Sequence, residues 1–152
     1  MEYGRIERTM YVEATPEVVY EVISSPEHLK QWWPDDASLE PVPGAVGTLS
    51  WGTGADQEIA SITVVDAEPH RLFSFRWTHP ADEAAAVGNS LFVTFELTPS
   101  GDGTTVHMAE TGFREMGWAI AVLEQQYNAH INGWNTHLPR LGDYVARLVS
   151  SR

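Results

Sequence analysis

The chain has 152 residues, 43% of them hydrophobic, which is the size and apolar content of one ordinary domain with a full hydrophobic core. Its 21 acidic and 9 basic side chains give a formal net charge of -12, which argues against the basic surfaces that nucleic acids and anionic membranes require, so we expect neither as a partner. Because there is no cysteine, disulfides, thiolate metal sites and thiol nucleophiles are also excluded.

The first predicted elements are a strand over residues 6–13 and two short helices. Thr15-Pro16-Glu17 and Ser25-Pro26-Glu27 each combine a hydroxyl N-cap, a proline at the first helical position and a glutamate at the positive helix end. We expect the first helix to bury Val18, Val19, Val22 and Ile23, and the second to bury Leu29, Trp32 and Trp33 before Pro34-Asp35-Asp36 stops it. The pair would brace one end of a sheet.

A run of strands follows, which we place at residues 46–52, 57–67, 70–79, 90–98 and 104–113. The clearest alternation lies in residues 91–97, where Leu91, Val93, Phe95 and Leu97 share one face. From Met116 onward, apolar residues recur at steps of three and four, which predicts a helix to the end of the chain. Pro139 is expected to kink it.

These elements predict an α+β fold: a curved antiparallel sheet of about six strands, two short N-terminal helices and one long C-terminal helix. At about 1.5 Å per residue the last helix is longer than any strand, so it should lie diagonally across the concave face. Because it covers only part of that face, we expect a pocket beside it. The longest apolar run, Trp118 to Leu123, is too short to cross a membrane, and we expect a soluble cytoplasmic protein.

The order and spacing of short motifs resemble a known family. The motifs include Ala14-Thr15-Pro16-Glu17, Trp32-Trp33, Phe95-Glu96-Leu97, Gly103-Thr104-Thr105-Val106 and Gly133-Trp134. Together they resemble the START-like helix-grip (SRPBCC) superfamily, and within it the homologues of the activator of the heat shock protein 90 ATPase. The resemblance implies one START-like domain over residues 1–152, with a cavity for a hydrophobic ligand and no shared catalytic residue.

Metal and cofactor chemistry finds little support in the sequence. The 6 histidines form no known metal motif, and His130 and His137 are two helical turns apart, roughly 10 Å along the axis, which is too far for one zinc ion. We therefore predict no metal site, no cofactor and no assigned catalytic residue.

Glu110 is the most unusual carboxylate in the sequence. Alternation from Val106 through Met108 places it on the apolar face of its strand. Burial of a carboxylate there is costly unless Arg76, His79 or His130 stays close.

The leading hypothesis is a module that binds a small hydrophobic or aromatic ligand between the sheet and the C-terminal helix. Trp77, Tyr127 and Trp134 would form walls, and Glu110 and His130 would hydrogen-bond a polar end of the ligand. The complete set of candidate site residues is Trp33, Trp51, Phe75, Trp77, Phe95, Glu110, Tyr127, His130 and Trp134.

Two other classes of function remain open. One is a cyclase, hydratase or hydrolase that uses Glu110 as general acid or base with His130 or His79 assisting. The other is a co-chaperone or regulatory interaction domain, with a homodimer or a protein partner.

Overall fold

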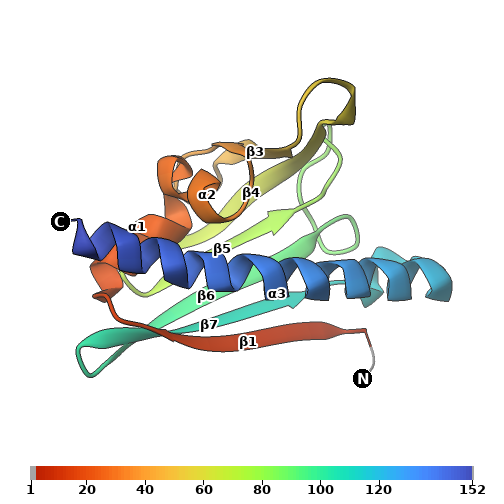
Figure 1. Ribbon diagram of the computed structural model, residues 1–152. Coiled ribbons are helices and arrows are strands. Elements are labelled where there is room, and N and C mark those ends of the chain that lie inside the picture. The colour runs from red at the N-terminus through yellow and green to blue at the C-terminus, as the bar shows by residue number, and fades with distance from the viewer. Residues whose placement is uncertain (1–2, 152) are drawn as a thin grey trace.

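The computed structural model describes residues 3–151 and contains one seven-stranded antiparallel sheet, in the order β1-β7-β6-β5-β4-β3-β2. Three α-helices lie against one face of this sheet (Figure 1). The strands are β1 (Arg5–Val12), β2 (Asp36–Ser38), β3 (Val46–Trp51), β4 (Glu58–Glu68), β5 (Leu72–Trp77), β6 (Leu91–Ser100) and β7 (Gly103–Thr111). The helices are α1 (Pro16–Ser24), α2 (Pro26–Trp32) and α3 (Ile120–Ser150), with single 3₁₀ turns η1 (Gly54–Asp56) and η2 (Arg114–Met116).

The sheet has seven strands where the sequence indicated about six. The additional strand is β2, whose three residues pair with β3 directly after the α2 helix ends. A strand of this length shows no periodicity, so alternation could not reveal it. The local signal is Gly47 in β3, because a Cβ atom there would lie 2.0 Å from the Ser38 carbonyl oxygen. Only glycine permits β2 to approach this closely.

The two short helices form as their sequences indicate. The Thr15 hydroxyl accepts a hydrogen bond from the Val18 backbone N–H at 3.4 Å, which caps α1, whereas Ser25 begins α2 without a side-chain cap. The Trp32 indole N–H donates to the Val22 carbonyl at 3.1 Å and so fixes α2 against α1. Of the residues expected inside, Val19, Val22, Ile23, Leu29, Trp32 and Trp33 are buried and Val18 is half-buried.

The long helix begins at Ile120 rather than at Met116, because residues 114–116 form η2 and Gly117 follows with a φ of +73°. It then continues to Ser150 as one helix, with Pro139 inside it. At about 1.5 Å per residue it is longer than the longest strand, and Figure 1 shows it crossing the sheet with its N-terminal end beyond the ends of the strands. Within residues 3–151, no helix is long and apolar enough to span a membrane.

Strand register places Glu110 in an apolar row that crosses the sheet. Ile6 of β1 pairs with Glu110 of β7, which pairs with Val93 of β6, and the row continues through Phe75 of β5 to Val64 of β4. All five side chains are at most 1% exposed. The alternation in β7 therefore predicted correctly that this carboxylate faces the core.

Candidate functional site

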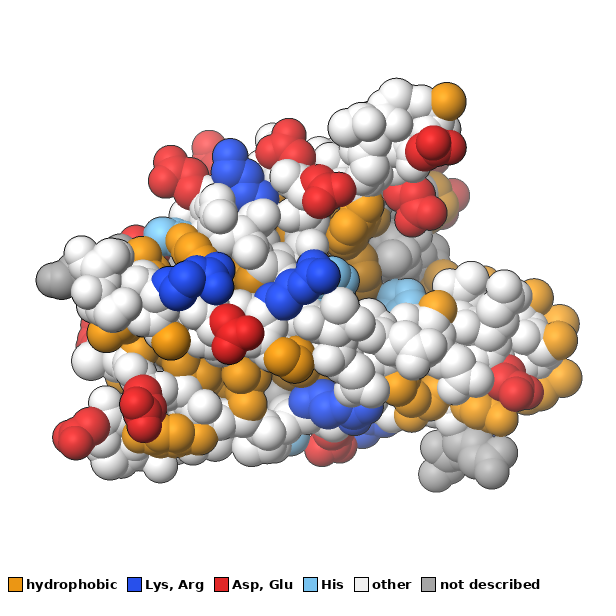
Figure 2. Space-filling view, viewed as in Figure 1, with side chains coloured by type: hydrophobic (Ala, Val, Ile, Leu, Met, Phe, Trp, Pro, Cys, Tyr) orange, Lys and Arg blue, Asp and Glu red, His pale blue; other side chains and the backbone are white. Residues whose placement is uncertain are grey.

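A cavity of about 670 Å³ lies between α3 and the β3–β4 end of the sheet. Figure 2 shows the molecule hollowed there, below the projecting β3–β4 connection. A volume of this size is in the range of ligand sites in proteins. We call it the tryptophan cavity, and its lining residues are Trp33, Trp51, Gly52, Asp56, Glu58, Ile59, Ala60, Trp77, Thr78, Gln126, Ala129, His130, Gly133, Trp134 and His137.

Four indole rings from four different elements form the apolar part of this lining. Trp33 follows α2 and lies centrally, with ring centroids 5.0 Å from Trp77 of β5, 5.2 Å from Trp134 of α3 and 6.1 Å from Trp51 of β3. Such distances are typical of favourable aromatic pairs. Because each ring contacts others in the group, the wall is held in one arrangement by the packing of helices on the sheet.

Glu110 lies behind this wall and orders it. Trp77 Nε1 donates to Glu110 Oε2 at 2.7 Å, and Trp134 Nε1 donates to Glu110 Oε1 at 2.8 Å. His130 Nδ1 lies 2.9 Å from the same Oε1. Both carboxylate oxygens thus have protein partners, which offsets the loss of hydration in a fully buried position. One carboxyl group orients three side chains of the lining.

The remaining polar lining residues come from the β3–β4 end of the sheet, from Thr78 after β5, and from α3. Asp56 and Glu58 are exposed at the rim. On α3, burial lowers the pKa of His137, and the positive charge of Arg140 lowers it further, against a smaller opposing effect of the Trp32 backbone. His137 Nδ1 is buried and makes no hydrogen bond with any residue between 3 and 151. The imidazole is therefore held mainly in its neutral form at neutral pH.

The structure places the nine candidate residues in two groups. Trp33, Trp51, Trp77, His130 and Trp134 line the cavity, whereas Phe75, Phe95, Glu110 and Tyr127 are absent from its lining. Phe75 and Phe95 form a layer beneath it, with ring centroids 5.7 Å from Trp33 and 6.2 Å from Trp134, respectively. They support the indoles rather than bordering the open space.

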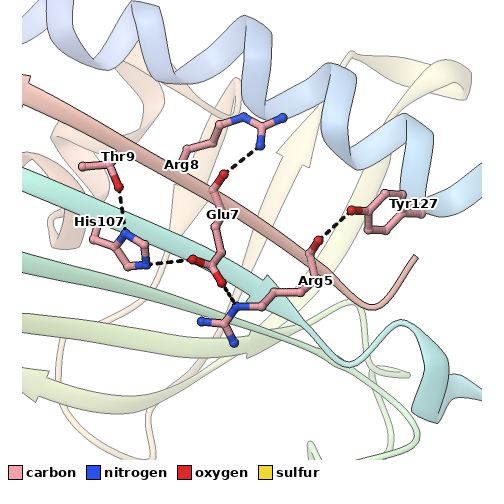
Figure 3. A network of polar contacts seen from close by, with 6 residues as sticks. All are labelled: Arg5, Glu7, Arg8, Thr9, His107 and Tyr127. Carbon is pink, nitrogen blue, oxygen red and sulfur yellow. Dashed lines mark hydrogen bonds and ion pairs between the residues drawn. The ribbon is translucent and has the colours of Figure 1, made fainter. Parts of the chain in front are cut away.

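Tyr127 is turned toward the other edge of the sheet. Its hydroxyl donates to the Arg5 carbonyl of β1 at 2.6 Å, and its ring lies 5.3 Å from that of Phe113. Figure 3 shows this contact beside the polar network of Arg5, Glu7 and His107 on β1 and β7. Tyr127 therefore fastens α3 to the sheet edge.

Of the three partners considered for Glu110, only His130 is one. His79 lies 3.0 Å from the Thr63 hydroxyl and 3.2 Å from the Pro80 carbonyl, and Arg76 stacks over Phe92 with 5.0 Å to the ring centroid. In the part of the chain that the structure describes, no three histidine, aspartate or glutamate side chains group closely enough to hold a metal ion.

Several lining residues were missed by the sequence reasoning. Asp56 ends the 3₁₀ turn η1 and Glu58 is the first residue of β4, and at these exposed positions no hydrophobic periodicity marks a face. The α3 residues did leave a signal, since positions 126, 129, 130, 133, 134 and 137 recur at steps of three and one along one helical face. Because this stripe contains glutamine, histidine and glycine besides tryptophan, a search for periodic apolar residues does not detect it.

A family profile described as Activator of Hsp90 ATPase homolog 1-like protein matches residues 13–146. The chain belongs to this family. The match confirms the family that the sequence motifs indicated, and it includes the site-bearing strands and most of α3. No curated protein matches the chain.

Solved structures share the fold of this family member at low sequence identity. Protein NE0264 from Nitrosomonas europaea matches with a TM-score of 0.79 and 14% identity, over 99% of this chain and 99% of that chain. Protein MLL2253 from Mesorhizobium loti matches with a TM-score of 0.76 and 20% identity, over 94% and 97%. The Aha1 dimer from Colwellia psychrerythraea matches with a TM-score of 0.70 and 20% identity, over 93% of this chain and 95% of that chain. At these identities the likeness establishes the fold alone.

Proposed function

We propose that this protein binds a small hydrophobic or aromatic ligand in the tryptophan cavity. The observation that carries the proposal is the cavity of about 670 Å³ with four indole side chains in its wall. Apolar surface with a few polar groups is the usual composition of a small-molecule site. The wall is also pre-organised, because Glu110 fixes Trp77, Trp134 and His130 before any ligand arrives.

A substitution of Gly133 can fill the cavity without changing the packing of the hydrophobic core. Gly133 lines the cavity on α3, and apart from its two chain neighbours and the backbone of its own helix, a Cβ atom at this position would have no described atom within 4 Å. Gly133→Leu would therefore place a side chain in the open space. Because leucine favours the helix more than glycine does, the free energy of unfolding should stay unchanged or rise by up to about 1 kcal/mol.

Native mass spectrometry of the protein purified from its own host tests the proposal. We expect the wild-type protein to retain a small molecule at one per chain, and Gly133→Leu, purified in the same way, to lose it while remaining folded. Gly133→Ala serves as the control with a small side chain. A wild-type protein that carries nothing, and that no compound in a thermal-shift screen stabilises, would contradict ligand binding.

A second candidate is an enzyme in which His130 acts on the bound molecule. His130 lines the cavity while its Nδ1 contacts Glu110 Oε1 at 2.9 Å, so Nε2 is the ring nitrogen left for a ligand. A carboxylate that orients a histidine in this way is a common arrangement for general base catalysis. The roles differ from those expected from the sequence, because Glu110 itself does not border the cavity.

Turnover of the retained molecule separates an enzyme from a binding protein. If His130 is a general base, wild-type protein should convert the ligand to a product of different mass, and His130→Gln should bind the ligand without converting it. Recovery of the unchanged ligand after prolonged incubation with wild-type protein would count against catalysis.

The family description favours one further alternative, a co-chaperone role that stimulates an Hsp90 ATPase. An ATPase assay with the Hsp90 of the same host tests it, and an unchanged rate would eliminate it. Sedimentation of the purified protein would test in parallel for a homodimer, which the dimer reported for the Colwellia protein motivates.

A further inference from the structure

We propose that the tryptophan cavity selects organic cations, specifically ligands in which an alkylated ammonium group is joined to an apolar or aromatic body. The inference rests on the proposed ligand binding and adds the charge of the ligand to it. Two independent features of the lining support it: the way the indole rings are presented, and the sign of the charges around them.

Two of the four indoles, Trp77 and Trp134, offer ring carbons to the cavity and no free donor. The N–H groups of Trp77 and Trp134 are both bound by Glu110, which lies outside the lining. A ligand therefore meets ring carbons of these two indoles rather than their N–H groups. Donation to a carboxylate also makes an indole ring more electron-rich. Tryptophan is the side chain whose face attracts cations most strongly.

The charges around the cavity have one sign. The carboxylates of Asp56 and Glu58 belong to the lining, and neither takes part in a hydrogen bond or ion pair with any side chain between residues 3 and 151. No lysine or arginine is among the lining residues of that same range. Figure 2 shows acidic side chains on the projecting β3–β4 end of the sheet, beside the hollow. A cation entering the cavity passes these free carboxylates.

The two histidines of the lining do not reverse the negative electrostatic potential of the cavity. Burial and the charge of Arg140 lower the pKa of His137, so its imidazole is neutral at neutral pH. His130 Nδ1 is paired with the Glu110 carboxyl group. Arg140 is the cation that acts on His137, and it lies outside the lining. The formal net charge of -12 adds a long-range attraction for cations.

Three probes of nearly equal shape and different charge test the inference. They are benzyltrimethylammonium, its neutral carbon analogue neopentylbenzene, and the anion phenylmethanesulfonate, each titrated against the full chain while tryptophan fluorescence is recorded. We expect the cation to bind about tenfold more tightly than the neutral probe, and the anion to bind most weakly.

Variants locate the preference in the cavity. Asp56→Asn with Glu58→Gln should weaken binding of the cation about fivefold and leave the neutral probe unchanged. Glu96→Gln with Asp102→Asn makes the same change in net charge on the β6–β7 hairpin, and should alter neither. Trp51→Leu keeps an apolar side chain in the lining but removes an aromatic ring. It should therefore weaken binding of the cation more than binding of the neutral probe.

The outcomes distinguish this inference from the proposed function beneath it. Equal binding of cation and neutral probe, both abolished by Gly133→Leu, would overturn the charge preference and leave ligand binding intact. Failure of all three probes to bind would overturn both. If the two double variants weaken binding of the cation equally, the preference comes from net charge alone. That result would overturn the proposal that this cavity selects cations.

Discussion

Glu110 connects the interior of the sheet to the wall of the tryptophan cavity. It is fully buried and accepts hydrogen bonds from two indoles, with a histidine at 2.9 Å from one oxygen. Indole N–H groups can only donate, so the residue opposite them must accept on both of its terminal atoms. A carboxylate meets this requirement and an amide does not.

Replacement of Glu110 by glutamine should therefore destabilise the protein although the shape is kept. The amide NH₂ would face at least one donor from Trp77 or Trp134, and we expect a loss of about 2–3 kcal/mol in the free energy of unfolding. Chemical denaturation measures it. Glu96→Gln, the same change at an exposed position of β6, should cost less than about 0.5 kcal/mol. Equal losses for the two variants would contradict this role for Glu110.

His137 gives the protein a stability that depends on pH. Burial lowers its pKa below the ordinary value of 6.5, so the unfolded chain takes up this proton at a higher pH than the folded protein does. The unfolded state therefore gains from acidification, and the free energy of unfolding falls as the pH drops below about 6.5 toward the lower folded pKa. Urea denaturation at several pH values should show this loss in wild-type protein and a smaller loss in His137→Gln. Parallel pH profiles would refute it.

The positions of individual residues also show which parts of the site could be predicted from the sequence and which could not. Period-two alternation in β7 placed Glu110 inside, because a strand's two faces follow directly from residue number. The choice of His130 over Arg76 and His79 as its partner depends on how α3 crosses the sheet, and no local pattern encodes that crossing. For the same reason Tyr127, one turn before Ile131 on α3, was expected in the wall and instead bonds to β1.

At the scale of elements, the start of α1 and the start of α2 have the same sequence pattern but different caps. The Thr15 side chain accepts from the Val18 N–H, whereas Ser25 makes no such bond. Thr15→Ala should reduce the free energy of unfolding by about 0.5–1 kcal/mol, and Ser25→Ala should change it by less. Thermal or urea unfolding compares the two. A larger effect at Ser25 would mean that the capping account is wrong.

Elements with a strong period were predictable and those without one were not. The long strands follow from alternation, and α3 from its steps of three and four. β2 and η2 have three residues each, so contacts with neighbouring segments determine where they form. β2 pairs with β3 beside Gly47, and η2 ends at the turn that Gly117 makes. The rim carboxylates Asp56 and Glu58 lie in and after a similar short turn, η1.

The β2–β3 pairing provides a test at this scale. Gly47→Ala would place a methyl group 2.0 Å from the Ser38 carbonyl oxygen, so β2 must move away from β3. Hydrogen exchange should then speed up at the amides that pair residues 36–38 with residues 48–50, while β6 and β7 remain protected. Unchanged exchange in β2 would show that the close approach is not required.

At the scale of the whole molecule, the cavity follows from a mismatch between one long helix and a curved sheet. α3 fills the concave face with Leu138, Leu141 and Val145 near its C-terminal end, while its middle presents Gly133 and His137 to open space. The sequence indicated this architecture and the presence of a pocket. The volume and the exact lining depend on the packing of α2 and the β3–β4 connection against that helix, which only the assembled fold provides.

Calorimetric titration of a neutral two-ring aromatic compound such as naphthalene is the most direct test of the central claim, because it needs neither a known ligand nor a charged probe. We expect one site per chain, a negative heat-capacity change from burial of apolar surface, and loss of binding in Gly133→Leu with its unfolding free energy preserved. Absence of saturable heat in the wild-type protein, or equal binding by Gly133→Leu, would contradict a ligand site between the sheet and α3.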